Sequence, residues 1–157
     1  GIVGLGNIGA LLAKKLHALN VKVLGYDGFL PGAVVKTMPV EPVEALEDIF
    51  QRADIISIHL RLTAENRGMI GRELLSQMKE TSYLINASRA GLIDEDALLN
   101  ALQLHKIAGA ALDVFEEEPL EAGHPLTKME NVKMTTHIAG DTVDSIARSP
   151  FQLVNVI

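Results

Sequence analysis

A glycine-rich turn near the start of the chain restricts its fold more than any other feature. The residues read Gly4-Leu5-Gly6-Asn7-Ile8-Gly9, which is the pattern G-x-G-x-x-G. Apolar residues 2–5 run into this turn, and residues 8–19 carry apolar side chains at helical spacing. In such a strand–turn–helix unit the first glycine permits the tight turn, the second lets a pyrophosphate approach, and the third lets helix and strand pack closely. The turn therefore predicts a dinucleotide-binding unit, against the alternative of a turn whose glycines serve packing alone.

Strand-like and helix-like segments alternate along the rest of the chain. Continuous apolar runs predict strands buried on both faces of a sheet. The expected strands are 2–5, 21–26, 54–60, 82–86, 107–113 and 132–135, with a further short one at 34–38 inside a loop over 28–42. The expected helices are 8–19, 43–52, 71–78, one capped by Asp94 that runs to about 105, and one from 141 that is interrupted near Pro150. This alternation predicts an α/β fold with one doubly wound parallel sheet, the Rossmann arrangement.

An acidic residue closes the second expected strand. Asp27 lies where a carboxylate can accept hydrogen bonds from both ribose hydroxyls of an adenosine and would repel a 2′-phosphate. No Arg or Lys follows it before Lys36, so the pattern favours NAD over NADP. Alone, an Asp at a strand end is as readily a simple turn residue. Together with the strand, the glycine-rich turn and the helix, Asp27 favours dinucleotide binding.

Composition excludes several other classes of protein. The 157-residue chain carries 14 basic and 20 acidic residues, and the net charge of -6 disfavours binding to nucleic acid or to an anionic membrane. It has no cysteine, so disulfide scaffolds, zinc–thiolate sites and thiol nucleophiles are excluded. No apolar run is long enough to cross a bilayer, and no signal-peptide pattern opens the chain. We expect no metal ion, no nucleic-acid or membrane partner, and a cytoplasmic setting.

The start of the chain bears on how much of a protein is present. Only three residues precede Gly4, whereas a strand usually has about five or six residues. We therefore expect residues 1–157 to form one NAD-binding domain whose first strand is cut short, as part of a longer protein.

Three later segments place polar side chains directly after expected strands. They contain Arg89, the acidic run that ends at Glu118, and His137. Taken singly, each has an ordinary interpretation, namely a surface arginine, a solvated acidic loop and a structural histidine. In a parallel sheet, however, ligands bind at the carboxyl ends of the strands. A carboxylate anchor, a proton donor and an acid that tunes this donor are the groups that carbonyl reduction requires.

The order of these segments resembles the D-isomer-specific 2-hydroxyacid dehydrogenases, the family of D-3-phosphoglycerate, glycerate/hydroxypyruvate and D-lactate dehydrogenases. The resemblance covers essentially the whole chain. It rests on the glycine-rich turn, Asp27, His59-Leu60-Arg61-Leu62-Thr63, the Arg89 segment, Leu112-Asp113-Val114-Phe115 with Glu118-Pro119, and His137-Ile138-Ala139-Gly140, in that order.

The resemblance implies a role for each catalytic candidate. Arg89 would hold the substrate carboxylate and polarise the 2-oxo group. His137 would protonate the carbonyl oxygen in reduction and accept the proton in oxidation, and Glu118 would hydrogen-bond His137 and keep it charged when it must donate. Asp113 would lie near the nicotinamide carboxamide, and the nicotinamide itself carries the hydride. The residues expected to bind the cofactor are Gly4, Gly6, Asn7, Ile8, Gly9, Asp27, Leu60, Thr63, Ala87, Ser88, Arg89, Asp113, His137 and Gly140.

The sequence departs from the family pattern at three positions. Arg61 stands where Pro is usual, beside the expected cofactor groove, where it would contact a phosphate or lie on the surface. Ala90 stands where Gly is common, so its turn must tolerate a Cβ. Thr136 stands where Pro is common, which makes its loop less rigid. We interpret His59, on a strand with apolar neighbours, as structural.

In this family the substrate domain is built from the chain before and after the cofactor domain, and it supplies the specificity pocket. The resemblance therefore implies that residues 1–157 alone bind NAD but turn over little or no substrate, and that the particular 2-hydroxy or 2-oxo acid is not encoded here. It also implies a homodimer through this domain. Two other classes stay open: an NAD(H)-sensing corepressor of the same fold, and a purely structural Rossmann domain in which Asp27→Ala leaves NAD affinity unchanged.

Overall fold

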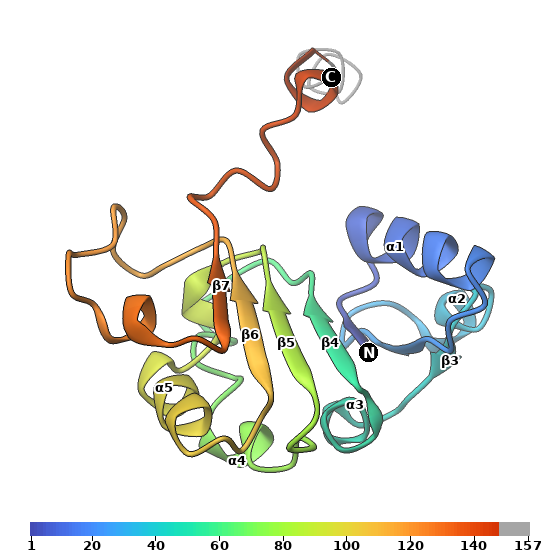
Figure 1. Ribbon diagram of the computed structural model, residues 1–157. Coiled ribbons are helices and arrows are strands. Elements are labelled where there is room, and N and C mark those ends of the chain that lie inside the picture. The colour runs from blue at the N-terminus through green and yellow to red at the C-terminus, as the bar shows by residue number, and fades with distance from the viewer. Residues whose placement is uncertain (148–157) are drawn as a thin grey trace.

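Seven parallel strands form one sheet in the computed structural model, which describes residues 1–147 (Figure 1). The strands are β1 (Ile2–Val3), β2 (Leu24–Tyr26), β3 (Glu41–Pro42), β4 (Ile55–Ile58), β5 (Tyr83–Asn86), β6 (Gly109–Leu112) and β7 (Val132–Met134). Their order across the sheet is β3-β2-β1-β4-β5-β6-β7, so the chain winds outward from β1 in both directions. This order confirms the predicted doubly wound α/β fold.

Short helices connect the strands. They are α1 (Asn7–Ala18), α2 (Gly32–Val35), α3 (Leu46–Arg52), α4 (Arg72–Leu75) and α5 (Glu95–Gln103), with 3₁₀ turns η1 (Ala90–Leu92) and η2 (Pro125–Lys128). Asp94 is confirmed as the N-cap of α5, because its carboxylate accepts a hydrogen bond from the Ala97 amide at 3.0 Å. Residues 143–147 begin the expected closing helix. The predicted interruption at Pro150 lies outside the described residues.

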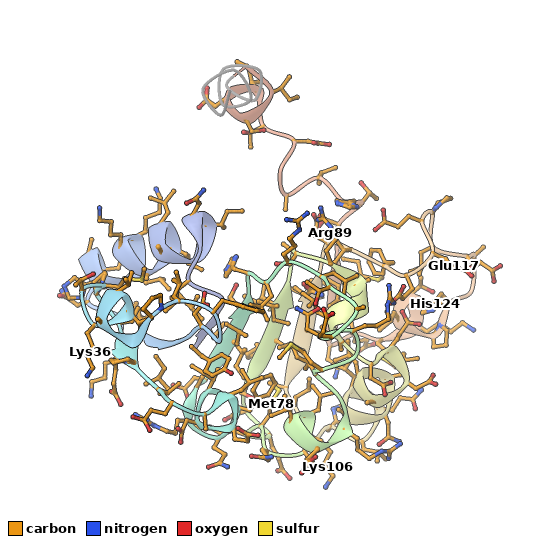
Figure 2. All side chains as sticks on the ribbon, turned by 180° about the vertical axis from the view of Figure 1, so that it is seen from behind. Lys36, Met78, Arg89, Lys106, Glu117 and His124 are labelled. Carbon is orange, nitrogen blue, oxygen red and sulfur yellow. The ribbon has the colours of Figure 1, made fainter. Side chains whose placement is uncertain are left out.

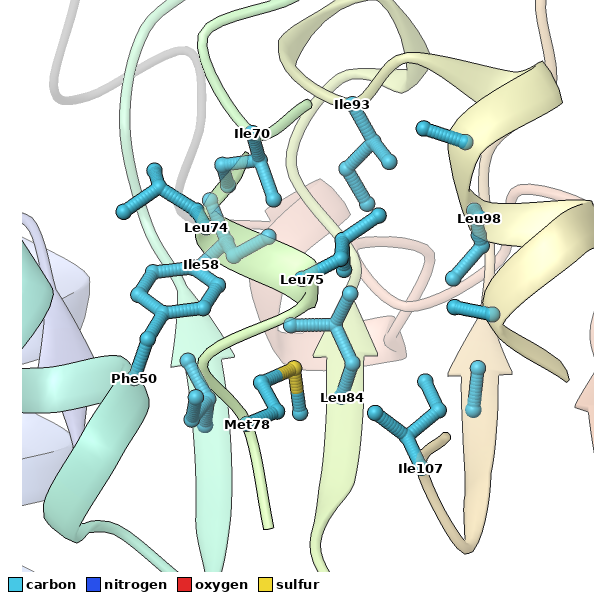
Figure 3. Close-up of a cluster of buried hydrophobic side chains, with 14 of the residues drawn as sticks. Phe50, Ile58, Ile70, Leu74, Leu75, Met78, Leu84, Ile93, Leu98 and Ile107 are labelled. Carbon is cyan, nitrogen blue, oxygen red and sulfur yellow. The ribbon is translucent and has the colours of Figure 1, made fainter. Parts of the chain in front are cut away.

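The two faces of the sheet carry separate hydrophobic cores. Successive residues of a strand point to opposite faces, and Ile2 and Val3 of β1 accordingly join different clusters. The smaller cluster, under α1 and α2, consists of Ile2, Leu5, Ala13, Val23 and Val35. The larger cluster packs α3, α4 and α5 onto the other face, and includes Phe50, Ile58, Leu75, Leu84, Leu98 and Ile107 (Figure 3). Full burial of each such side chain stabilises the fold by about 1.5–3 kcal/mol, so both cores hold the strands in register.

The expected strand over 34–38 is wrong, because α2 occupies part of this segment. Pro31 precedes α2 with φ of -56°, and its carbonyl accepts the amides of Val34 and Val35 at 2.8 and 3.2 Å. The edge strand is instead β3, in which Pro42 is tolerated because an edge position leaves no partner for its missing N–H.

Two helices are shorter than predicted. Helix α3 begins at Leu46 and not at residue 43, because the Val43 amide donates to the Gly25 carbonyl at 3.0 Å and extends the pairing of β3 with β2. Helix α4 ends at Leu75.

The carboxyl ends of all the described strands lie along one edge of the sheet, and the chain leaves β7 at that edge (Figure 1).

Candidate cofactor and active site

The three glycines of the turn after β1 differ in their surroundings. At Gly4 the backbone φ is +94°, and a Cβ would lie 2.7 Å from the His59 carbonyl oxygen. A Cβ at Gly9 would lie 2.0 Å from the Gly4 carbonyl oxygen, whereas a Cβ at Gly6 would meet no atom within 4 Å. The fold therefore requires glycine at Gly4 and Gly9, while Gly6 borders open space in which a ligand can approach the backbone.

Helix α1 starts directly after this open space. Its first residues, Asn7 and Ile8, have exposed side chains, and its first turn contains no acidic residue. The leading amides of a helix lack acceptors within the helix and lie at the positive end of its dipole. The start of α1 thus fits a pyrophosphate.

Asp27 follows β2 and faces the same turn. One carboxylate oxygen accepts from the Leu5 amide at 2.8 Å, and the other accepts from the amides of Phe29 and Leu30 at 2.9 and 3.0 Å. Burial works to raise the pKa of Asp27, but these three hydrogen bonds outweigh it and lower the pKa below its ordinary value of 3.8. A charged carboxylate has about four acceptor positions, so it can also accept from a ribose hydroxyl.

The loop after β4 lies against the glycine-rich turn. A Cβ on Gly4 would lie 3.0 Å from Cδ2 of Leu60. Asn66 shapes this loop, since its Oδ1 accepts from the Thr63 amide and its Nδ2 donates to the Arg61 carbonyl, both at 2.8 Å. Arg61 is exposed and forms no ion pair with another described residue.

His59, at the end of the same strand, has a local partner. Its Nε2 lies 2.9 Å from Oγ of Ser57, two residues earlier on β4. Burial lowers the pKa of His59 below its ordinary value of 6.5, which favours the neutral ring. This geometry supports the structural interpretation of His59.

Arg89 stands at the carboxyl edge of the sheet, after β5, whereas Lys106 lies at the opposite edge (Figure 2). Asn86 is 1% exposed; its Nδ2 donates to the Arg89 carbonyl and its Oδ1 accepts from the Ser88 amide, both at 3.0 Å. The Ser88 hydroxyl donates to the Ile58 carbonyl of β4 at 2.6 Å. The exposed Arg89 guanidinium donates to the Ser88 carbonyl at 2.7 Å. The backbone is thus fixed, while the cation stays accessible to a ligand.

The segment around Arg89 accommodates an alanine without strain. Ala87 before Arg89 is exposed, and Ala90 after it begins η1. Among the non-glycine residues of the described chain, positive φ occurs only at Asn20, His105 and His137. Ala90 therefore does not occupy a conformation that needs glycine.

His137 and Glu118 form a direct pair. Nδ1 of His137 lies 2.8 Å from Oε2 of Glu118, and Oε1 of Glu118 accepts from the Phe115 amide at 2.9 Å. The hydrogen bond from His137, followed by that from Phe115, lowers the pKa of Glu118 below its ordinary value of 4.5. An ionised Glu118 orients the imidazole, and within residues 1–147 no protein group bonds Nε2. The pair is accessible to a ligand, since the His137 side chain is 49% exposed.

Asp113 is buried directly after β6 and reaches the segment that carries His137. Its carboxylate accepts from the amides of Ile138 and Ala139 at 3.0 and 2.9 Å and from the Thr135 hydroxyl. Gly140 lies beyond this contact and is exposed.

The structure brings Arg89, Glu118 and His137 to the ends of neighbouring strands, and it places the glycine-rich turn and Asp27 across β4 from them. A dinucleotide lying along this edge would span both groups. Over residues 1–147 no cluster of three His, Cys, Asp or Glu side chains is arranged for a metal ion. No helix of the same residues has the length and hydropathy to span a bilayer.

Sequence reasoning assigned no role to three residues that shape the site. Asn86, Asn66 and Thr135 hold the Arg89 segment, the loop after β4 and the Asp113 carboxylate. Only Asn86 carried a signal, as a polar residue that ends an apolar strand.

Comparisons with known proteins agree with this geometry. Residues 1–139 match the family described as D-isomer specific 2-hydroxyacid dehydrogenase, NAD binding domain. A glyoxylate reductase of Thermofilum pendens is 45% identical over 94% of this chain and 44% of its own length. A D-3-phosphoglycerate dehydrogenase of Methanocaldococcus jannaschii is 42% identical over 92% of this chain and 28% of its own.

Solved structures agree as well. A D-lactate dehydrogenase from Aquifex aeolicus, complexed with NAD and lactic acid, superposes with a TM-score of 0.85 at 33% identity, over 99% of this chain and 51% of that one. The chain thus spans about half or less of the length of the relatives it matches. It belongs to the D-isomer specific 2-hydroxyacid dehydrogenases, as their NAD-binding domain.

Proposed function

We propose that the whole protein is an NAD-dependent oxidoreductase that interconverts a D-2-hydroxy acid and its 2-oxo acid. The contact between His137 Nδ1 and Glu118 Oε2, 2.8 Å at the carboxyl edge of the sheet, carries this proposal. It is the arrangement of a histidine that exchanges a proton at Nε2 while a carboxylate holds its other nitrogen.

Separate residues would bind the cofactor, bind the substrate and transfer the proton. The open backbone at Gly6 and the start of α1 would hold the pyrophosphate, and Asp27 the adenosine ribose. The nicotinamide supplies the hydride when bound. Arg89 would bind the substrate carboxylate with its planar fork. His137 would donate a proton from Nε2 to the 2-oxo oxygen in reduction and take it back in oxidation, with Glu118 accepting from Nδ1–H throughout.

The substrate class follows from the groups present. Arg89 selects a carboxylate, and His137 requires a carbonyl or hydroxyl next to it, which together describe a small 2-oxo or 2-hydroxy acid. The relatives that match include enzymes named for glyoxylate and 3-phosphoglycerate. We also propose that residues 1–157 alone bind NAD but turn over little substrate, because the relatives are longer than the part that this chain matches.

Two finer expectations belong to the same proposal. A homodimer through this domain, implied by the family resemblance, would be tested by sedimentation. A cytoplasmic setting stays a prediction that cell fractionation would test.

The direct test is a substrate panel. The full-length protein would be mixed with NADH and glyoxylate, hydroxypyruvate or pyruvate, and NADH loss followed by absorbance. We expect turnover of at least one acid, and Arg89→Lys should raise KM for that acid about tenfold or more, because a point charge replaces a bidentate fork. Binding of NADH without turnover of any acid would instead indicate an NAD(H)-sensing module.

A further inference from the structure

One buried carboxylate spans the segment that carries His137. Asp113 is 5% exposed, and all three donors to its carboxylate come from residues 135–139. Oδ1 accepts from the Thr135 hydroxyl and from the Ile138 amide at 3.0 Å, and Oδ2 accepts from the Ala139 amide at 2.9 Å. These donors lie on both sides of His137 in the sequence: the side chain of Thr135 before it, and the backbone amides of Ile138 and Ala139 after it.

The backbone at His137 needs such support. Its φ is +59°, in the left-handed region that side chains with a Cβ rarely adopt. This conformation turns the next two amides towards Asp113 and leaves the imidazole 2.8 Å from Glu118. An ionised carboxylate only accepts hydrogen bonds, and all of its partners here are donors, so the match is complete.

The electrostatics agree with the geometry. Burial works to raise the pKa of Asp113, but the bonds from Thr135, Ala139 and Ile138 outweigh it, and the pKa falls below its ordinary value of 3.8. Asp113 is therefore the ionised acceptor that the three donors require at neutral pH.

We infer that Asp113 is a positioning residue for His137: it fixes the backbone of residues 135–139 so that the imidazole stays against Glu118. The catalytic consequence rests on the function proposed above, whereas the backbone contact does not. This task differs from the cofactor contact that the family resemblance implied for Asp113.

Asp113→Asn tests the inference in the full-length protein. Asn has nearly the same shape, but its amide donates where Asp accepts, so it cannot satisfy all three donors. We expect kcat to fall roughly a hundredfold, the scale expected for a displacement of about 1 Å, with the Kd for NADH unchanged. Asp113→Asn combined with His137→Gln should be no slower than His137→Gln alone, because Asp113 acts through His137. A tenfold weaker Kd for NADH, or additive losses in the double variant, would overturn the inference in favour of a cofactor contact.

Amide hydrogen exchange gives a readout that does not need turnover. In Asp113→Asn the Ile138 or Ala139 amide that faces the new NH2 group should exchange at least about tenfold faster without substrate, because it loses its acceptor. Thr135→Val, which keeps the carboxylate and removes one donor, should give a smaller increase and serves if Asp113→Asn does not fold. Asp54→Asn is the control, because Asp54 is exposed and pairs with Lys79 at the opposite edge of the sheet.

The two proposals fail separately. Unchanged exchange at Ile138 and Ala139 in both variants would overturn the positioning of His137, whatever the activity. A wild-type protein that reduces no 2-oxo acid, but whose exchange rises as expected, would overturn the proposed function and leave the backbone role of Asp113 standing.

Discussion

Gly6→Ala should weaken cofactor binding and leave the stability of the fold almost unchanged. The added methyl meets no atom within 4 Å, and the backbone at Gly6 has φ of -65° and ψ of -164°, which is extended. Alanine is a poorer N-cap than glycine, by about 0.5–1 kcal/mol. It also restricts the unfolded chain, which stabilises by about 0.4–1 kcal/mol. The two effects offset each other, so we expect the free energy of unfolding to change by less than about 0.5 kcal/mol.

The same methyl would occupy the space that a pyrophosphate needs. Loss of one hydrogen bond between a backbone amide and a charged phosphate costs about 1.5–3 kcal/mol. At about 1.4 kcal/mol for each factor of ten, Gly6→Ala should weaken the Kd for NADH roughly 10- to 100-fold.

Gly9→Ala is the matched comparison. Its methyl would lie 2.0 Å from the Gly4 carbonyl oxygen and 3.2 Å from Cγ2 of Ile2, so the start of α1 must move away from β1. Such overpacking costs about 1–3 kcal/mol or more. The main effect of Gly9→Ala should therefore be a lower free energy of unfolding.

Urea unfolding and fluorescence titration with NADH measure the two effects. We expect a nearly wild-type unfolding midpoint with weak NADH binding for Gly6→Ala, and a clearly lower midpoint for Gly9→Ala. Wild-type NADH affinity in Gly6→Ala would refute the placement of the pyrophosphate. An unfolded Gly6→Ala would refute the claim that the fold does not need this glycine.

Asp27, Asp113 and Glu118 all have a lowered pKa when folded. The unfolded chain therefore takes up more protons as pH falls, so the stability they supply is complete above their ordinary pKa values, near 4, and is lost as pH falls through the folded values. Unfolding by urea should thus become easier from about pH 5 downward, with a smaller slope in Asp113→Asn; an equal slope would exclude this assignment. Asn86→Asp keeps the acceptor for the Ser88 amide but loses the donor to the Arg89 carbonyl, so KM for the 2-oxo acid should rise about tenfold at unchanged NADH affinity; an unchanged KM would show that Asn86 does not position Arg89.

Much of the fold could be predicted because buried parallel strands appear in the sequence as short, continuous apolar runs. The apolar runs around Ile56, Leu84 and Ala110 needed no tertiary information, since strands covered on both faces are apolar throughout. The segment after Pro31 could not be assigned in this way. Its valines favour a strand, but a proline at the helix start and the packing of Val35 under α1 favour α2.

Some residues of the site could likewise be predicted from the sequence, and others could not. Arg89, Glu118 and His137 could be proposed because each follows a strand, and the carboxyl ends of parallel strands share an edge. The hydrogen bonds from residues 135–139 to Asp113 could not be predicted, because they join positions 22 to 26 residues apart through the pairing of β6 with β7. The left-handed φ at His137 could not be predicted either, because histidine is only enriched in that region and mostly adopts other backbone conformations.

The central claim is that His137, held by Glu118, transfers the proton to a 2-oxo acid at this edge of the sheet. Its most direct test is a single-turnover reaction in which the full-length protein, preloaded with NADH, is mixed with a saturating 2-oxo acid. His137→Gln should bind NADH as tightly as wild type, whereas its single-turnover rate should fall about 10²- to 10⁴-fold, the contribution expected of a general acid. A single-turnover rate equal to that of wild type would contradict the assignment.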